Sequence, residues 1–198
     1  MSGQNKVSGV VLAGGLARRM DHRDKGLLEF NGRPLVAYAL AAMAPLVDDL
    51  LINANRNQDS YRQFGYPVIG DGSDNFDGPL AGMLAAMRTA RHPTLLVMPC
   101  DSPLIQTEHL QRLLSALTDD VDIATAFDGE RLHPVFAALK TKLQTDLEQY
   151  LNSGERKLQA WFGRHALARV DFSDAATMFA NVNTRDELQK LKQAMGRR

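Results

Sequence analysis

The apolar positions of this chain follow two patterns that alternate along its length. Short and almost continuous apolar runs are typical of strands that are covered on both faces of a sheet. Apolar residues at intervals of three and four are typical of helices. The strands are predicted at residues 7–13, 50–52, 67–69, 94–98, 121–127, 132–138 and 167–172. The helices are predicted at residues 32–44, 59–64, 80–90, 107–117, 140–151 and 155–162, with a further one after 184.

Strands that alternate with helices predict an α/β protein with a three-layer α/β/α, Rossmann-like fold. The sheet should be mostly parallel, and the hairpin-like segment 127–137 predicts an antiparallel strand late in the chain. Helix-start residues support this reading, because Pro34 suits a first turn, Thr107 can cap a helix, and Thr184 with Glu187 forms a capping box. A length of 198 residues suits one large domain, so we expect a single domain over residues 1–198.

Composition and charge exclude several classes of protein. The 23 Lys and Arg residues balance 23 Asp and Glu residues, whereas a dedicated nucleic-acid binder usually carries a basic excess. Cys100 has no second cysteine to pair with, which is compatible with a reducing cytoplasm. No apolar run approaches the ~20 residues of a membrane span, and the first residues are polar, unlike a signal peptide. We therefore expect a cytoplasmic protein without nucleic-acid or membrane partners.

The loop after the first predicted strand has the composition of a phosphate clamp. Gly14 and Gly15 let backbone N–H groups approach anionic oxygens, and Arg18, Arg19 and Lys25 supply positive charge shortly afterwards. Neither the P-loop pattern nor the dinucleotide-binding glycine pattern is present, so the loop belongs to neither of those classes. A glycine pair after a strand is also a common tight turn, and the nearby cations are what favour phosphate binding.

Polar residues also follow the other predicted parallel strands, where ligands bind in open α/β sheets. These residues are Asn53, Asn55, Asp71 and Asp101. Asp101 follows a strongly apolar strand, and a carboxylate there suits Mg²⁺, which usually takes one or two protein carboxylates together with substrate phosphates. A turn-capping aspartate is the alternative for Asp101, and backbone-bonding turn residues are the alternative for Asn53 and Asp71. Cys100 is interpreted as a buried thiol and not as a nucleophile.

Several blocks of the sequence resemble a known family. The opening Leu12-Ala13-Gly14-Gly15, Arg18-Arg19-Met20 and Lys25 is similar to that of the LAGG nucleotidyltransferases, although Ala17 stands where many members carry Gly or Ser. Five later blocks, in the right order, resemble the molybdenum cofactor guanylyltransferases of the MobA type. These blocks are Asn53-Ala54-Asn55-Arg56, Gly78-Pro79-Leu80-Ala81-Gly82-Met83, Pro99-Cys100-Asp101-Ser102-Pro103, His133-Pro134-Val135-Phe136 and Asn181-Val182-Asn183-Thr184. Together with the opening loop they span most of the chain, from Gly9 to Leu188.

The resemblance implies a reaction in which GTP, with Mg²⁺, guanylylates the phosphate of molybdenum–molybdopterin and releases pyrophosphate. It places GTP in the N-terminal half and molybdopterin in the C-terminal half. The implied nucleotide-binding residues are Leu12, Ala13, Gly14, Gly15, Lys25, Asn53, Asp71, Pro79, Leu80, Gly82 and Asp101. Asp101 is the implied metal ligand, and Asp101, Lys25 and Arg19 are the expected catalytic residues. Asn181 and Asn183 resemble pterin contacts, with loop residues before a helix cap as the alternative.

The acceptor phosphate is already an anionic nucleophile, so we expect charge neutralisation and positioning, and no covalent enzyme intermediate. Arg156-Lys157 and the possible stacking surface Trp161-Phe162 are candidates for the acceptor side, and the latter pair is also compatible with a core position. Molybdopterin-delivering and molybdoenzyme-maturation proteins are the expected partners. Two alternatives stay open: a relative that uses CTP on molybdopterin or an NTP on a sugar 1-phosphate, and a nucleotide-binding regulator without catalysis.

Overall fold

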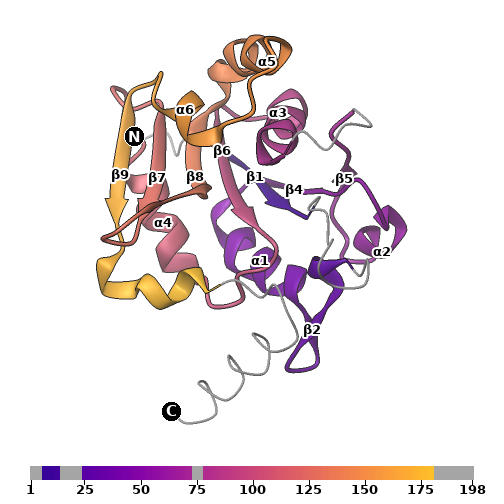
Figure 1. Ribbon diagram of the computed structural model, residues 1–198. Coiled ribbons are helices and arrows are strands. Elements are labelled where there is room, and N and C mark those ends of the chain that lie inside the picture. The colour runs from indigo at the N-terminus through magenta and orange to yellow at the C-terminus, as the bar shows by residue number, and fades with distance from the viewer. Residues whose placement is uncertain (1–5, 14–23, 73–77, 181–198) are drawn as a thin grey trace.

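The computed structural model describes residues 6–13, 24–72 and 78–180. Within them a seven-stranded sheet has the order β5-β4-β1-β6-β8-β7-β9 (Figure 1). The strands are β1 (Val7–Leu12), β4 (Asp49–Asn53), β5 (Val68–Ile69), β6 (Thr94–Pro99), β7 (Ile123–Phe127), β8 (Leu132–Lys140) and β9 (Leu167–Asp171). Each lies at a position that the apolar pattern predicts.

The sheet is mostly parallel, and its single antiparallel member in the described part of the chain is β8. β1 pairs in parallel with β4 and β6, β4 with β5, and β7 with β9, whereas β8 runs antiparallel between β6 and β7. The predicted α/β class and the late antiparallel strand are therefore confirmed.

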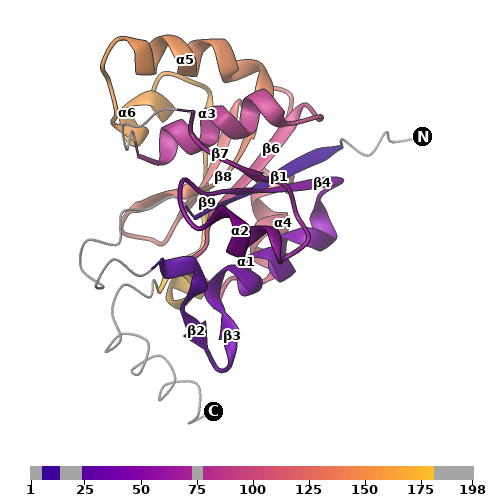
Figure 2. The same ribbon diagram turned by 90° about the vertical axis from the view of Figure 1, so that its right-hand side faces the viewer.

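Helices cover both faces of the sheet (Figure 2). One layer contains α1 (Leu35–Met43), α2 (Gln58–Arg62) and α4 (Thr107–Ser115), and the other contains α3 (Pro79–Thr89), α5 (Gln144–Asn152) and α6 (Leu158–Phe162). Because successive strand residues point to opposite faces, Val10 of β1 joins the core beneath α3 and α5, while Val11 joins the core beneath α1 and α4. None of the described helices is long and apolar enough to cross a membrane.

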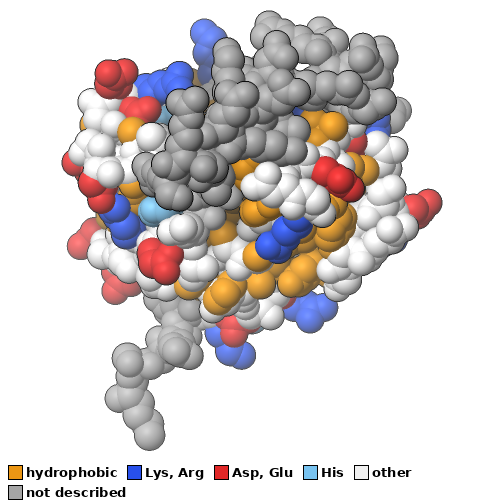
Figure 3. All heavy atoms as spheres, turned by 90° about the horizontal axis from the view of Figure 1, so that it is seen from below, with side chains coloured by type: hydrophobic (Ala, Val, Ile, Leu, Met, Phe, Trp, Pro, Cys, Tyr) orange, Lys and Arg blue, Asp and Glu red, His pale blue; other side chains and the backbone are white. Residues whose placement is uncertain are grey.

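A small hairpin below α1 is absent from the sequence prediction. β2 (Glu29–Phe30) pairs with β3 (Arg33–Pro34), and the turn residues Asn31 and Gly32 have φ angles of 50° and 74°. Asn-Gly favours this tight turn because both residues tolerate positive φ. The Arg33 guanidinium lies 4.9 Å from the centre of the Tyr38 ring on α1. Viewed from below, hydrophobic side chains gather around basic ones on the visible part of the molecule (Figure 3).

Several predicted boundaries shift in the structure. α1 begins at Leu35, α5 begins at Gln144 after the 3₁₀ turn η3 (Thr141–Leu143), and α6 begins at Leu158. Thr107 does not cap α4, because its hydroxyl donates to the Ala42 carbonyl at 3.0 Å and Gln106 occupies the cap position. The sequence also gave no indication of three further 3₁₀ segments: η1 (Lys25–Leu27), η2 (Ala44–Leu46) and η4 (Ser173–Phe179). The helix predicted after 184 lies outside the described residues.

Candidate functional site

Three strands end side by side where the polar residues of the sequence converge. In the register of the sheet, Leu12 at the end of β1 lies beside Asn53 of β4 and Pro99 of β6. The backbone continues this pairing beyond the strands, because the Ala13 N–H donates to the Asn53 carbonyl at 2.8 Å and the Cys100 N–H donates to the Leu12 carbonyl at 3.0 Å. The start of the glycine loop, Asn53 and the Asp101 turn are therefore held at one edge of the sheet.

Asp71 is fixed at this edge by two asparagine side chains. Asn53 Nδ2 donates to one carboxylate oxygen at 2.8 Å, and Asn55 Nδ2 donates to the other at 2.6 Å. The Asp71 N–H in turn donates to Asn55 Oδ1 at 2.8 Å. Asn53 is almost completely buried, with an exposed fraction of 2%. Asn55 and Asp71 thus bond to each other, and Asn53 donates to the same carboxylate, which gives Asp71 a defined orientation.

Helix α3 packs directly against this cluster through Gly82. A Cβ at position 82 would clash with Asn53 Oδ1 and would lie 3.0 Å from a Leu12 methyl carbon. Pro79 is exposed at the start of α3, whereas the Leu80 side chain is buried in the core beneath the helix. A nucleotide contact at position 80 would therefore have to come from backbone atoms.

Lys25 and Asp101 form an ion pair at the same edge. Lys25 Nζ lies 3.8 Å from Asp101 Oδ2, and the exposed fractions of the two side chains are 27% and 14%. Asp101 lies two residues after the end of β6, and Lys25 opens the 3₁₀ turn η1. The pair brings together a cation and a carboxylate that are 76 positions apart in the sequence (101 minus 25). Such an arrangement can bind a phosphate group and a divalent cation next to each other.

Cys100 is not a suitable nucleophile in this setting. Its thiol is buried, and burial together with the negative charge of Asp101 raises the pKa of Cys100 well above its ordinary value. A protonated thiol is a poor nucleophile because the thiolate is the reactive form. The geometry supports the sequence-based interpretation of a structural thiol.

Other predicted site residues fall into two groups. Gly14, Gly15, Arg18, Arg19, Asn181 and Asn183 lie outside the described residues. The interpretation of Trp161 and Phe162 as a stacking surface is wrong, and their alternative as core residues is correct. Their exposed fractions are 0% and 1%, and the Trp161 indole donates to Asp146 at 2.7 Å where α5 and α6 pack together. Arg156 and Lys157 are exposed between these helices.

Sequence reasoning missed two sets of polar residues near this edge. Asp24 accepts hydrogen bonds from Tyr61 of α2 and from the Gly26 backbone, immediately beside Lys25. After the end of β7 and at the start of β8, His133 Nε2 lies 2.6 Å from Asp128 Oδ2, and the His133 ring stacks on Phe179 with the ring centres 3.9 Å apart. Backbone N–H groups of Arg131 and Glu130, together with His133, lower the pKa of Asp128. The signals for these contacts in the sequence were weak: an aspartate next to Lys25 and the His133-Pro134 block.

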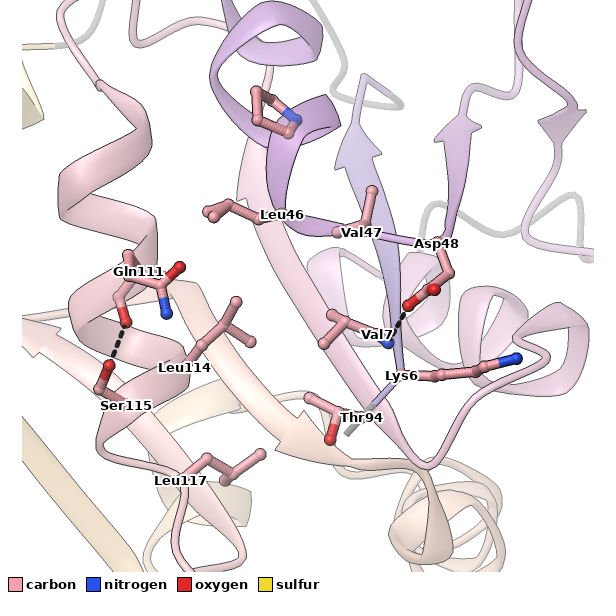
Figure 4. A pocket seen from close by; sticks show the side chains of 11 residues that line it. Lys6, Val7, Leu46, Val47, Asp48, Thr94, Gln111, Leu114, Ser115 and Leu117 are labelled. Atoms are coloured by element: carbon pink, nitrogen blue, oxygen red, sulfur yellow. Dashed lines mark hydrogen bonds between the residues drawn. The ribbon is translucent and has the colours of Figure 1, made fainter. Parts of the chain in front are cut away.

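A cavity among the described residues lies at the opposite edge of the sheet, at the amino ends of the strands (Figure 4). It has a volume of about 460 Å³ and is lined by Val7, Asp48, Thr94, Leu114 and neighbouring residues. The Val7 N–H donates to Asp48 Oδ2 there at 2.9 Å. Ligands of open α/β sheets bind beyond the carboxyl ends of the strands, so we place the candidate site with Asn53, Asp71 and Asp101.

Residues 9–170 match the MobA-like NTP transferase domain family. The chain belongs to this family. It is 44% identical over 191 residues to the molybdenum cofactor guanylyltransferase of Shewanella loihica, and the matched residues cover 96% of this chain and 97% of that relative. A second relative of the same name, from Shewanella sediminis, is 44% identical over 193 residues, covering 97% and 98% of the two chains. The resemblance noted in the sequence is therefore confirmed.

Solved structures show how widely this MobA-like fold is shared. Molybdopterin-guanine dinucleotide biosynthesis protein A of Archaeoglobus fulgidus superposes with a TM-score of 0.79 at 20% identity, covering 96% of this chain and 100% of that chain. The 4-diphosphocytidyl-2C-methyl-D-erythritol synthase of Anaerococcus prevotii superposes with a TM-score of 0.73 at 13% identity, covering 98% and 97%. At these identities the similarity concerns the fold alone.

Replacing Gly82 by alanine is expected to displace the Asn53 amide and to remove one of the two amide donors of Asp71. Alanine gains about 1 kcal/mol of helix propensity over glycine, which offsets part of an overpacking cost of ~1–3 kcal/mol. The free energy of unfolding should therefore change little, while the affinity for a nucleoside triphosphate falls. Calorimetric titration with GTP and thermal denaturation measure the two quantities.

Gly163→Ala is the matched control, because a Cβ at position 163 would meet its nearest neighbour, the Gln159 carbonyl, at an ordinary 3.5 Å. This variant should bind GTP as the unmodified protein does. A Gly82→Ala variant with unchanged affinity would contradict the placement of Asn53 and Asp71 in the nucleotide site.

Proposed function

We propose that this protein transfers GMP from GTP to the phosphate of molybdenum–molybdopterin, forming the guanine dinucleotide cofactor and releasing pyrophosphate. The observation that carries the proposal is the 44% identity over nearly the whole of relatives named molybdenum cofactor guanylyltransferase. The geometry agrees with it, because a lysine, an amide-bound carboxylate and a second carboxylate converge at the carboxyl edge of the sheet.

In this reaction an oxygen of the acceptor phosphate attacks the α-phosphorus of GTP, and the bond from that phosphorus to the pyrophosphate oxygen breaks. Both partners are anions, so the protein must offset their repulsion and hold them in line. Lys25 supplies positive charge at the edge where Asp101 emerges. We assign Asn53 and Asp71 to the nucleoside end of GTP, with Pro79, Leu80 and Gly82 lying against the guanine. The acceptor needs no activation through a covalent enzyme intermediate.

We assign a Mg²⁺ ion to Asp101. Mg²⁺ keeps several water ligands and usually combines one or two protein carboxylates with substrate phosphates. The donor set fits this habit, since Asp101 supplies one partly buried carboxylate beside the ammonium group of Lys25. When bound, the ion would offset negative charge on the phosphates. Lys25 would neutralise the remaining charge together with Arg19, which we also assign to catalysis.

The remaining assignments concern the rest of the chain. Leu12, Ala13, Gly14 and Gly15 would bind the nucleotide through backbone groups, and Asn181 and Asn183 would contact the pterin. We propose that residues 1–198 act as one nucleotidyltransferase domain with GTP in its N-terminal half. A cytoplasmic location is proposed from the single buried cysteine. Molybdopterin-delivering and molybdoenzyme-maturation proteins are the proposed partners.

The fold does not select the nucleotide by itself, because a diphosphocytidyl-methylerythritol synthase superposes well on this chain. Use of CTP on molybdopterin, or of an NTP on a sugar 1-phosphate, therefore stays the principal alternative. A nucleotide-binding regulator without catalysis is less favoured, because the Lys25–Asp101 pair exceeds what binding through a glycine loop requires. Release of pyrophosphate on turnover distinguishes an enzyme from such a regulator.

Asp101→Ala is expected to lower nucleotidyl transfer by roughly a thousandfold or more, because several kcal/mol of charge stabilisation would be lost. Pyrophosphate release measures the rate. Asp122→Ala, which removes a carboxylate paired with Lys142 at 2.8 Å near the amino end of β7, is the control and should keep its activity. Normal activity in Asp101→Ala at ordinary Mg²⁺ would refute the metal assignment, and a collapse of thermal stability would favour the turn-capping role.

GTP should be used at least ~100-fold more efficiently than ATP or CTP, because a polar site built for one base edge leaves its groups unsatisfied with another base. The ratio of kcat/KM values for the three nucleotides, with molybdopterin as acceptor, measures this preference. Equal turnover of CTP would favour the cytidylyltransferase alternative.

Asn181→Asp and Asn183→Asp are expected to slow guanylylation of molybdopterin while GTP affinity stays near that of the unmodified protein. A new carboxylate beside an anionic acceptor should repel it. Calorimetry with GTP and a turnover assay with molybdopterin separate the two effects, with Asn152→Asp on the exposed end of α5 as control. Equal losses in both measurements would assign these asparagines to the nucleotide half or to the fold. Efficient turnover of a sugar 1-phosphate would overturn the molybdopterin assignment.

A further inference from the structure

We propose that Tyr61 and Asn57 are positioning residues for catalysis, which act through Asp24 to hold Lys25 against the nucleotide phosphates. This inference rests on the proposed function of Lys25 as a phosphate contact. It concerns residues of α2 and its cap, which follow β4 in the chain, and the short turn that carries Lys25.

The Asp24 side chain connects these segments through hydrogen bonds. One of its carboxylate oxygens accepts from the Tyr61 hydroxyl and from the Gly26 N–H, the latter at 3.3 Å. The other accepts from Asn57 Nδ2 at 3.2 Å. Asp24 is also the N-cap of η1, whose first residue is Lys25. The backbone that carries Lys25 is therefore fixed by donors that come from α2 and its cap.

Tyr61 is an anchored donor in this arrangement. Its side chain is completely buried in the core beneath α1, and burial raises the pKa of the Tyr61 hydroxyl well above its ordinary value. The hydroxyl therefore remains a proton donor throughout the physiological range. Gly26 lies directly on it, since a Cβ at position 26 would clash with the Tyr61 oxygen. Packing of Gly26 against the buried Tyr61 side chain thus determines how closely η1 approaches α2.

Asn57 holds an uncommon backbone conformation that serves the same contact. Its φ of 50° lies in the left-handed region, which asparagine tolerates better than most residues. Its carbonyl accepts from the N–H groups of Ser60 and Tyr61 at 3.0 and 3.2 Å, which starts α2. The same residue thereby sets the direction of the helix that carries Tyr61 and donates to Asp24.

The segment also reaches the other side of the proposed nucleotide site. Asn53 and Asn55 donate their amides to Asp71, and Asn57, two residues further on, donates its amide to Asp24. Alternate asparagines of one short stretch thus hold two carboxylates from two different loops. The spacing between the nucleoside end at Asp71 and the phosphate end at Lys25 is consequently fixed by this stretch.

A positioning role follows from the contacts themselves. Tyr61 is completely buried, so it cannot touch a nucleotide directly. Asp24 is an anion next to the proposed phosphate position, where an unpaired carboxylate would repel the ligand. Among the described residues, its hydrogen bonds come from neutral hydroxyl, amide and backbone donors, while Lys25 pairs with Asp101.

The test compares two tyrosine hydroxyls that differ in their acceptor. Tyr61→Phe keeps the ring in the core and removes the donor to Asp24. Tyr38→Phe removes a hydroxyl that donates to the Phe30 carbonyl of the β2–β3 hairpin at 2.7 Å, and it serves as the matched control. We expect Tyr61→Phe to weaken GTP binding by up to about tenfold, because the backbone that holds Lys25 at the phosphates loses a hydrogen bond to a charged group. Tyr38→Phe should bind GTP normally.

A double-mutant cycle with Lys25→Ala decides whether Tyr61 acts through Lys25. If it does, Tyr61→Phe will have no further effect on GTP affinity once Lys25 is absent, because the two changes are coupled. Steady-state kinetics should show a raised KM for GTP and an unchanged KM for molybdopterin in Tyr61→Phe. Additive losses, or losses in both KM values, would overturn the proposal.

Asn57→Gly keeps the test independent of the core, because glycine adopts the left-handed conformation freely and Asn57 is exposed. It should also weaken GTP binding. Thermal denaturation is measured for every variant, and a loss of stability with unchanged GTP affinity would reduce both residues to a structural role. GTP binding and turnover by the unmodified protein are measured first. Their absence contradicts the proposed function, whereas their presence with unaffected variants contradicts only the positioning role.

Discussion

The alignment of three parallel strand ends is the constraint on which the site depends. Leu12, Asn53 and Pro99 lie next to one another in the sheet, and hydrogen bonds from the Ala13 and Cys100 N–H groups carry the pairing one residue further. The three strands end at the same edge of the sheet. The segments that follow them, which carry the glycine loop, the asparagine cluster and Asp101, therefore begin close together. A shift of register in either pair would separate them and would also turn apolar side chains out of the two cores.

The site is organised around carboxylates whose partners differ in charge. Asp71 and Asp24 are held by neutral amide and hydroxyl donors, whereas Asp101 faces the ammonium group of Lys25. Neutral donors fix a carboxylate without cancelling its charge, while an ion pair can exchange its partner for a phosphate or a metal ion. The two fixed carboxylates therefore suit orientation, and the Lys25–Asp101 pair suits the phosphate chemistry of a nucleotidyltransferase.

The MobA-like fold tolerates wide differences in sequence. Chains with 20% and 13% identity superpose on it, and the names of these proteins differ in the nucleotide they concern. At these identities the shared feature is the arrangement of the sheet and its helices. The tight packing of Gly82 on Asn53 illustrates the precision of this edge, since even one added carbon atom has no room there.

The sequence by itself determined the seven strands and their mostly parallel arrangement, because apolar runs are local signals. It also singled out Asn53, Asp71 and Asp101 as site candidates, because polar residues that follow such runs are local signals too. It did not predict the β2–β3 hairpin, although Asn31-Gly32 is a local turn signal, and it left Trp161 and Phe162 open between surface and core. Only the tertiary structure decided that both aromatic side chains are buried and that Tyr61 reaches Asp24 across 37 positions. Burial and long-range hydrogen bonds depend on which elements pack together, and no local pattern of residues encodes that choice.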